Sequence, residues 1–407
     1  MTQSHPFVMA WVTALSLGCA TCGNPGPEET ITLVIAGQSL IKVDPRQIWP
    51  NAFSGVRPFI ETADIAFTNF EMAVASADTR CGLPADYVTI TGEPPIPPEN
   101  RPGNTGGPHA VPPDVMEFLA SLGFDLMSLS NNHAWDLGEC GVLSTIEAAE
   151  SHGVTHAGTG RSAEEALEPA YIDAQGTRFA LVAGTTSRDE RDLLSGNVNG
   201  VWTGHQDDWD RNLSAVREAA AHADFVIYYH HFQIDEGDFE GVGEGERNAD
   251  GHTYVEDIAA WQESFARAII DAGASMYLGH GHRGFDGIEI YRGRPLIRQF
   301  GGLAYHAMGD IGGYPGQFAF WGLLGNLSVV DGSVKRMEFI PLTLNEGQDL
   351  IEQYDREEFL RRRGMPEVAT GAVADSILMR FKELSQRYGT DVAIANGRAL
   401  LEVPAGG

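Results

Sequence analysis

Polar side chains that can bind metals follow four apolar segments of this chain, at the points where the segments end. The clearest case is residues 127–138, MSLSNNHAWDLG, where an apolar run is followed by Asn132 and His133. The other three ends carry Glu71 with Asn69, His231, and the pair His280 and His282. An amide oxygen is a neutral metal ligand, and histidine is either a ligand or a general acid. The pattern therefore predicts a metal centre with a proton donor beside it.

Asp136 follows His133 by three residues, and the sequence leaves two interpretations of it open. Its carboxylate either caps the helix predicted to begin there or accepts the second N–H of the His133 ring and orients that ring. We take His133 and Asp136 as the catalytic pair. Asn69 and Asn131, which lie next to predicted ligands, are candidates for binding the substrate. An Asn-His pair alone more often serves turn chemistry, so the prediction depends on the other strand ends.

The segment Gly279-His280-Gly281-His282 is the most specific part of the pattern. Its small residues let the backbone approach an ion, and its two imidazoles can address two adjacent metals. Imidazole, carboxylate and amide ligands together suit Mn, Fe or Zn better than Ca or a cysteine-bound structural zinc. With Glu71 shared between two such ions, the centre can activate water and bind a phosphoryl oxygen, while His133 protonates the leaving group. This chemistry is that of a metal-dependent phosphoesterase.

The segments that carry these residues are predicted to be buried strands alternating with helices. Continuously apolar runs predict strands at 31–37 (ended by Gly37), 64–68, 124–129, 179–185, 225–229 and 275–278. Helical spacing predicts helices at 55–63, 114–122 (with Asp114 as cap), 143–151, 209–223 and 255–272. Hairpin-like strands follow at 287–291, 295–300, 318–330 and 333–342, and two charged amphipathic helices at 348–388. This order predicts an α/β sandwich with mixed sheets, with ligands at the carboxyl ends of the strands.

The chain has 407 residues, of which 43% are hydrophobic, which is enough for one large α/β domain or two smaller ones. We expect a leader and linker at 1–30, one domain at 31–345 and a helical extension of that domain at 346–407, with a Pro-rich insertion loop at 77–113. The formal charge of −29 repels nucleic acid at long range, so we expect no nucleic-acid partner. An anionic substrate would need local cations, most simply bound metal.

The first residues resemble an export signal. Residues 6–18 are apolar, too few to span a bilayer, and fit the core of a signal peptide. Leu17-Gly18-Cys19 resembles a bacterial lipoprotein cleavage site, although the leader has no Lys or Arg and Ser16 stands where Leu is usual. We therefore expect an exported protein of the bacterial cell envelope whose only membrane contact is a lipid anchor at Cys19. The alternative is a misplaced start codon and a soluble protein.

Cys81 and Cys140 each follow a predicted site loop. In an oxidising compartment they can form a disulfide close to the site. Two unrelated thiols are an equally good interpretation, because the sequence does not give their separation.

Several segments of the chain resemble the CapA family of capsule or poly-γ-glutamate synthesis proteins. They are ADIAFTNFE (63–71), MSLSNNHAWDLGECGVLSTI (127–146), HAGTGRSAEEAL (156–167), DFVIYYHHF (224–232), LGHGHRGFDGIEIYRGRPLI (278–297) and KELSQRYGTDV (382–392). The resemblance runs from about Ile31 to about Leu401. It implies a calcineurin-like metallophosphoesterase fold, a four-layer α/β/β/α sandwich with C-terminal helices. It also implies one metal site made of Glu71, Asn132, His231 and His280.

The chain departs from the family at the other metal site. The first strand of the family ends in Gly-Asp, whose Asp is a ligand, whereas this chain has Gly37-Gln38. The neutral amide removes a full charge, so this site keeps Glu71 and His282, with Gln38 as a doubtful ligand. Further departures are Phe232-Gln233 for Trp-Gly and Gly301-Gly302 for Gly-Asn. His230 and His306 are additional imidazoles near site loops. One interpretation is that they compensate for the lost ligand, but we favour the other, that both are ordinary polar loop residues.

Three hypotheses for the function follow. The first, which we favour, is an enzyme of the cell envelope, a metal-dependent hydrolase that acts on a phosphoester. The second, which the family name implies, is a non-hydrolytic factor in the synthesis or export of an anionic capsule or poly-γ-glutamate-like polymer. The third is a surface-anchored binding protein with a vestigial metal site. Gln38 weakens the first hypothesis, and the retention of His133 and Asp136 weakens the third.

Overall fold

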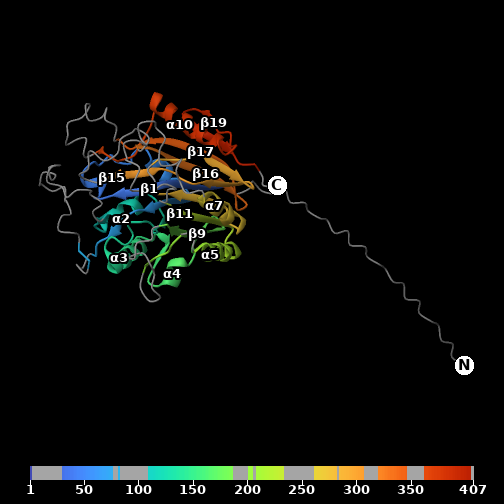
Figure 1. Cartoon of the computed structure of the whole chain (residues 1–407), viewed down its shortest axis with the longest axis horizontal. Coiled ribbons are helices and arrows are strands. Elements are labelled where there is room, and N and C mark those ends of the chain that lie inside the picture. Colours follow the sequence, from blue (N-terminus) through green and yellow to red (C-terminus); the bar gives the residue numbers. More distant parts are fainter. Residues whose placement is uncertain are drawn as a thin grey trace.

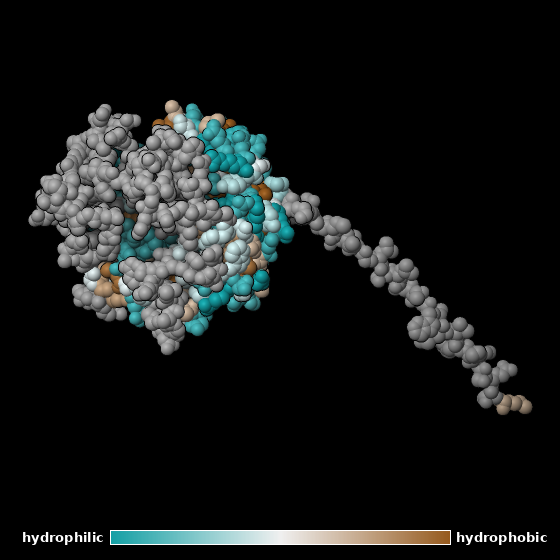
Figure 2. All heavy atoms as spheres, in the orientation of Figure 1, coloured by the Kyte–Doolittle hydropathy of each residue, from teal (hydrophilic) through white to brown (hydrophobic). Residues whose placement is uncertain are grey.

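The computed structural model describes residues 1, 30–76, 81–82, 109–186, 200–204, 208–232, 261–281, 284–306, 320–345 and 362–404. Within these residues two β-sheets pack face to face, and helices cover the outer face of each sheet (Figure 1). Hydrophilic residues dominate the described surface on the face that Figure 2 shows, in keeping with the net charge of −29.

The larger sheet has ten strands in the order β19-β20-β17-β16-β1-β2-β5-β6, with β15 beside β1 and β18 beside β17. Its strands are β1 (Ile31–Ile41), β2 (Ile65–Phe70), β5 (Leu126–Ser128), β6 (Thr155–Ala157), β15 (Gly302–His306), β16 (Trp321–Val330), β17 (Ser333–Thr343), β18 (Glu367–Val368), β19 (Ala393–Ala395) and β20 (Arg398–Glu402). The strands β1, β2, β5 and β6 run parallel, so their carboxyl ends lie at one edge of the sheet.

The smaller sheet has six strands in the order β13-β14-β12-β11-β9-β8. They are β8 (Ala170–Ala174), β9 (Thr177–Thr185), β11 (Phe225–His231), β12 (Met276–His280), β13 (Ile288–Tyr291) and β14 (Arg294–Ile297). Again the central strands β9, β11, β12 and β14 run parallel. Two short ladders complete the strands: β3 (Ala73–Val74) with β4 (Ala110–Val111), and β7 (Thr159–Gly160) with β10 (Gly200–Val201).

Helices cover the outer face of each sheet with separate apolar cores. The larger sheet packs against α1 (Arg57–Glu61), α2 (Asp114–Ser121) and α3 (Gly138–Ser151), and the smaller sheet against α5 (Trp209–His222) and α7 (Trp261–Asp271). Two short helices remain, η1 (Pro45–Gln47) and α4 (Ala163–Leu167), and Leu167 of α4 packs against the core of the smaller sheet. The predicted four-layer α/β/β/α sandwich is thereby confirmed.

A third core fills the space between the sheets. Phe67 of the larger sheet and Phe179 of the smaller one belong to it, and so does Phe381 of α10 (Gly371–Gln386). The tail is also tied down by the Tyr388 hydroxyl, which donates to Asp286 Oδ2 at 2.5 Å. The described part of the C-terminal extension is therefore built into the same body as the strands.

Polar residues directly before four parallel strands fix the register of the ladders. Each side chain accepts the backbone N–H of a residue in the neighbouring strand, at 2.8–3.1 Å. The pairs are Asp64 with Thr32, Asp125 with Ala66, Asp224 with Arg178, and Ser275 with Val226. Because a slip in register would move every following side chain, these contacts also set where the strand ends lie.

The strand β1 is longer than predicted, because Gly37 does not end it. The strand continues through Gln38 to Ile41, where it pairs in parallel with β15. A Cβ at position 37 would lie 1.7 Å from the carbonyl oxygen of Gly301. The glycine serves a close approach of two backbones, and the predicted strand end is wrong.

The tail differs from the prediction of two helices at 348–388. Residues 346–361 lie outside the described part, and the described tail forms α10 together with β18, β19 and β20. The strands β19 and β20 form a hairpin around Asn396-Gly397, whose positive φ angles of 53° and 69° suit a two-residue turn. The prediction of Asp114 as a helix cap is also wrong, because Pro113 occupies the cap position of α2.

Candidate metal centre

Strand ends from both sheets bring three metal-binding side chains together. Glu71 follows β2 of the larger sheet, and His231 and His280 end β11 and β12 of the smaller sheet. All three are buried, and one ligand atom from each lies within 4.8 Å of the others. The His280 Nδ1 and the Glu71 Oε2 are 4.0 Å apart. Packing of the two sheets thus assembles side chains that are far apart in the sequence.

Asn132 adds a fourth donor to this group. Its Oδ1 lies 2.9 Å from the Nε2 of His231. Two atoms bound to one ion at about 2.1 Å and at right angles lie about 3 Å apart, so this spacing suits a shared ion. The ligand atoms of Glu71, His231 and His280 are farther apart, at up to 4.8 Å. Small side-chain shifts would bring them onto one ion, because two ligands on opposite sides of an ion are about 4.2 Å apart. Two imidazoles, a carboxylate and an amide suit Mn, Fe or Zn.

The two asparagines predicted to bind substrate are fully buried and hold neighbouring site residues. The Nδ2 of Asn69 donates to the Glu71 Oε2 at 3.4 Å. The Nδ2 of Asn131 donates to the Phe70 carbonyl at 2.8 Å, and its Oδ1 accepts the His133 backbone N–H at 3.0 Å. These contacts fix the ends of β2 and β5 relative to each other. Contact of either asparagine with substrate stays a prediction.

His133 and Asp136 form a hydrogen-bonded pair beside the metal group. The His133 Nδ1 lies 2.8 Å from the Asp136 Oδ2, and their side chains are 18% and 16% exposed. The other ring nitrogen, Nε2, lies 3.2 Å from the Asn132 Nδ2. Because α3 begins at Gly138 with no side-chain cap, Asp136 orients the histidine and does not cap the helix. The imidazole therefore turns its Nε2 toward the metal group.

Two residues near the site were not found from the sequence. The His109 backbone N–H donates to the Asp136 Oδ2 at 2.5 Å, and its ring centroid lies 3.8 Å from that of His133. His109 follows a Pro- and Gly-rich segment without periodicity, so no local pattern indicates its position. Tyr229 is fully buried on the same face of β11 as His231. In the sequence it is indistinguishable from other apolar residues of that strand.

The second predicted metal position is described only in part. Gln38 is buried in β1, where it pairs in the ladder with Asn69 of β2. His282 lies outside the described residues. Gly281, which precedes it, has a φ of 146°, a conformation that favours glycine. Gln38 thus lies beside the strand that leads to Glu71, and its role as a ligand stays a prediction.

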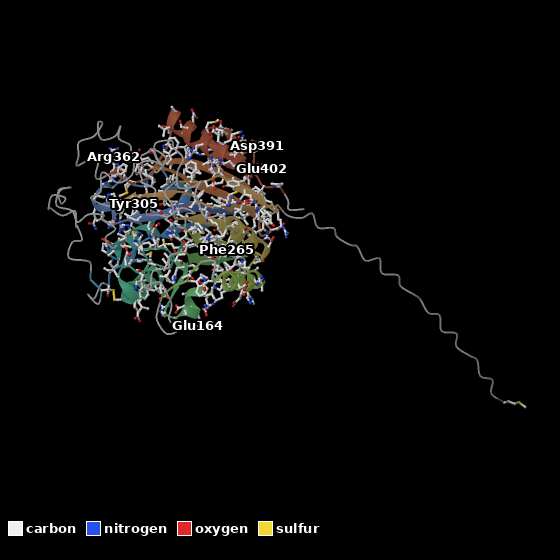
Figure 3. All side chains as sticks on the ribbon, in the orientation of Figure 1. Glu164, Phe265, Tyr305, Arg362, Asp391 and Glu402 are labelled. Carbon is white, nitrogen blue, oxygen red and sulfur yellow. A yellow bond between two sulfur atoms is a disulfide. The ribbon has the colours of Figure 1, made fainter. Side chains whose placement is uncertain are left out.

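His230 points away from the metal group, although it is adjacent to His231. Its Nδ1 lies 2.5 Å from the Tyr277 hydroxyl, and its Nε2 lies 3.0 Å from the Gly204 carbonyl oxygen. Its ring packs against Phe265 of α7, which is labelled in Figure 3. His230 is therefore a fully buried residue of β11 with partners in the outer core, and the prediction that it lies in a loop is wrong. His306, the other additional imidazole, is the buried last residue of β15.

Cys81 and Cys140 form a disulfide, with their Cα atoms 5.8 Å apart. Of the two interpretations that the sequence left open, the structure thus shows the bonded one. Cys140 lies in the first turn of α3, directly after the loop that carries Asn132 and His133. The bond therefore joins the beginning of the predicted insertion loop to the helix that follows the candidate acid.

The predicted leader is not part of the described structure. Cys19 and its neighbours lie outside the described residues, so the lipid anchor stays a prediction. The same holds for most of the predicted Pro-rich loop, since 77–80 and 83–108 are also outside. Among the residues that are described, no helix is long and apolar enough to cross a membrane.

The fold and the site together define a class of protein. A four-layer α/β/β/α sandwich with carboxylate, imidazole and amide donors at its strand ends has the architecture expected of calcineurin-like phosphoesterases. The chain belongs to the family described as Bacterial capsule synthesis protein PGA_cap, which matches residues 32–305. This match confirms the resemblance to CapA proteins.

The chain is similar to several known proteins, all at low identity. The uncharacterized protein y4sH of Sinorhizobium fredii is 22% identical over 440 residues, which cover 86% of this chain and 88% of that protein. The capsule biosynthesis protein CapA of Bacillus anthracis is 20% identical, over 72% of this chain and 62% of that protein. A solved structure of a novel phosphatase from Mycoplasma pneumoniae covers 78% of this chain and 94% of that chain, with 11% identity and a TM-score of 0.43. A structural likeness this distant carries no information about activity.

Proposed function

We propose that this protein is a metal-dependent hydrolase of phosphoesterase type that acts in the bacterial cell envelope. The observation that carries the proposal is the convergence of Glu71, His231, His280 and Asn132 beside a histidine held by a carboxylate. A buried carboxylate next to imidazoles is stabilised when all of them bind one ion. The adjacent His133–Asp136 pair adds a proton donor, which a purely structural ion would not need.

The four donors would hold one divalent transition metal, Mn, Fe or Zn. When bound, the ion supplies positive charge to a phosphoryl oxygen and lowers the pKa of its water. It also provides the local cation that an anionic substrate needs on a protein with a net charge of −29. A second ion would depend on His282 and Gln38, and the neutral amide makes that position the weaker one.

His133 would donate a proton to the leaving-group oxygen. Because its Nδ1 lies 2.8 Å from the Asp136 carboxylate, that nitrogen carries the hydrogen of the pair, and Nε2 is left to exchange a proton with substrate. Asp136 also accepts the His109 backbone N–H, so two donors hold its carboxylate in place. Asp136 would stabilise the protonated imidazole and keep the ring oriented.

Asn132 would connect the metal position to the acid. Its Oδ1 faces His231, and its Nδ2 lies 3.2 Å from the Nε2 of His133. A single amide therefore sets the spacing between the ion and the proton donor. A phosphoryl group held at the ion would lie beside His133 for this reason.

A second function is favoured by Gln38 and by the family. In this alternative the protein is a non-hydrolytic factor in the synthesis or export of an anionic capsule or poly-γ-glutamate-like polymer, in line with the name of the Bacillus anthracis relative. The ion would then bind polymer carboxylates, and loss of His133 would have no effect. Both functions fit an exported protein with a lipid anchor at Cys19, which we propose as its location.

Hydrolysis of a generic aryl phosphate with added Mn distinguishes the two functions. We expect turnover by the wild-type protein and a loss of at least about 100-fold in kcat for His133→Ala, with metal content unchanged. His152→Ala is the matched control, because His152 is an exposed histidine at the end of α3, and it should keep full activity. Absence of turnover in a wild-type protein that does bind metal would reject hydrolysis and support the polymer function.

A further inference from the structure

Tyr229 faces the metal group from inside the sandwich. Side chains alternate along β11, so Tyr229 and His231 point to the inner side of the sheet, while Tyr228 points outward. The Tyr229 ring lies 5.4 Å, centroid to centroid, from the ring of Phe67 in β2. This strand of the opposite sheet leads directly to Glu71. Tyr229 thus lies on the strand that ends in a predicted histidine ligand, and it packs against the strand that leads to the predicted carboxylate ligand.

The Tyr229 hydroxyl is buried and has no hydrogen-bond partner among the described residues. Buried tyrosine hydroxyls usually have a partner, and a buried polar group without one costs about 1–3 kcal/mol. A tyrosine hydroxyl can donate a hydrogen bond, and a carboxylate oxygen can accept one. The strand that packs against Tyr229 leads to such a carboxylate, Glu71, which is a predicted metal ligand.

Tyr228 shows that the chain can satisfy such a hydroxyl internally. Its O–H donates to the Oδ1 of Asn212 at 2.8 Å, on the outer side of the same sheet. Asn212 is itself held by the Trp202 Nε1 at 2.9 Å and by the Thr203 carbonyl at 2.9 Å. The two neighbouring tyrosines are equally buried, yet within the described part of the chain only the outward one has a hydrogen-bond partner. The inward one lies on the face of β11 that also carries His231.

We propose that Tyr229 is a positioning residue of the metal centre and that its hydroxyl donates a hydrogen bond to the Glu71 carboxylate when an ion is bound. This inference rests on the proposed metal-binding function. Residues that hydrogen-bond to a ligand fix its orientation, and their removal typically lowers metal affinity by about 10–100-fold. Asn69 supports the same carboxylate from the larger sheet, at 3.4 Å, and Tyr229 would support it from the smaller one.

Tyr229→Phe tests the proposal, and Tyr228→Phe is its matched control. Each protein is freed of metal, Mn binding is measured by titration calorimetry, and Tm is measured with and without Mn. We expect Tyr229→Phe to bind Mn about 10–100-fold more weakly than wild type. Its metal-free Tm should be unchanged or higher, because the substitution removes a hydroxyl without a partner. Tyr228→Phe should show the reverse, a lower metal-free Tm and wild-type Mn affinity.

The possible outcomes separate this inference from the proposed function. Wild-type Mn affinity in Tyr229→Phe would overturn the inference and leave the metal site in place. A metal-free Tm lowered as much as in Tyr228→Phe would also overturn it, because the hydroxyl would then have a partner without metal. If inorganic phosphate bound more weakly to Mn-loaded Tyr229→Phe while Mn affinity stayed normal, Tyr229 would be a substrate contact instead. Failure of the wild-type protein to bind Mn, Fe or Zn would reject the proposed function itself.

Discussion

On the outer face of β11, His230 and Tyr228 lie beneath α5 and α7, and both have partners within the protein. The Tyr277 hydroxyl and the Gly204 carbonyl flank the His230 ring, and Asn212 accepts the Tyr228 hydroxyl. On the inner face of the same strand, His231 converges with Glu71 and His280 between the sheets, and Tyr229 lies on that face as well. One strand therefore carries hydrogen-bonded core residues on one side and a proposed metal ligand on the other.

The difference between the two faces lies in what surrounds them. Helices α5 and α7 cover the outer face at Tyr228 and His230, so the chain must satisfy these buried polar groups to avoid an unpaired dipole. The inner face meets a second sheet, whose own strand end adds a carboxylate and an amide. Residue type alone does not distinguish a metal ligand from a core histidine. The face of the strand on which the histidine lies, and the element that packs against that face, distinguish the two.

The largest expected effect comes from replacing one histidine on each face. His231→Ala removes a ligand, so Mn affinity should fall by at least about 100-fold and the rise in Tm on adding Mn should disappear. His230→Ala removes two hydrogen bonds and leaves a cavity, so the free energy of unfolding should fall by about 2–4 kcal/mol. The second variant should keep the rise in Tm with Mn, measured by thermal unfolding with and without the metal. Loss of that rise in His230→Ala would contradict the division between the faces.

Asp136→Asn addresses the proton donor beside the inner face. The amide would still accept the His109 N–H but would stabilise the protonated His133 ring less, so kcat should fall by about 10–100-fold. Metal content and KM should stay near wild type, because the side chain of Asp136 bonds to His133 and to the His109 backbone N–H, neither of which is a proposed metal ligand. Asp210→Asn, at an exposed position of α5, is the control. Equal kcat in both variants would remove Asp136 from the mechanism.

Gln38→Asp tests whether a second ion can join the first. The substitution restores the carboxylate that the family has at this point, so Mn bound per chain should rise from one toward two. Metal mass spectrometry of the purified protein measures this ratio. Gln38→Glu is the control, because it adds the same negative charge on a side chain that is one methylene longer. An unchanged ratio in Gln38→Asp would show that position 38 does not face the metal group.

The smallest expected effect concerns a buried carboxylate with a structural role. Burial raises the pKa of Asp125 to about 6, from 3.8, so the folded state binds its proton more tightly than the unfolded state does. The resulting stability is present below about pH 4 and is lost as pH rises through about 6. Asp125→Asn keeps an acceptor for the Ala66 N–H. Between about pH 5 and pH 7, wild type should therefore lose about 1–2 kcal/mol more unfolding free energy than the variant. An equal pH dependence in both proteins would contradict this assignment, and Mn affinity should be the same in both.

The parts of the fold that follow periodic rules were predictable, and so was the grouping of the ligands. The apolar strands that lead to Glu71, His231 and His280 could be recognised one by one. Parallel pairing brings the strand ends of each sheet to one edge, and the packing of the two sheets then joins the two edges. The close approach at Gly37 could not be recognised, because it depends on the carbonyl of Gly301 from a distant segment. The Asn396-Gly397 dipeptide is a local sequence signal for a hairpin, but the prediction of helices in the tail did not take it into account.

The residues around the ligands were less predictable than the ligands themselves. His109 reaches His133 only because β4 pairs with β3, and a two-residue ladder leaves no pattern in the sequence. The contact of Tyr229 with Phe67 arises from the packing of one sheet on the other, which no local spacing encodes. Such contacts are set by tertiary structure and leave no pattern in the sequence.

The Cys81–Cys140 bond has a consequence for the covalent topology of the site. With a sequence separation of 59, it closes a ring of chain that contains the loop 131–136 but excludes Glu71, His231 and His280, the three buried side chains of the proposed metal site. A single cut by a protease inside this ring leaves one covalent molecule, whereas a cut outside it releases a separate fragment. The acid-bearing half of the centre is thus protected against loss by nicking, and the protection ends when the disulfide is reduced.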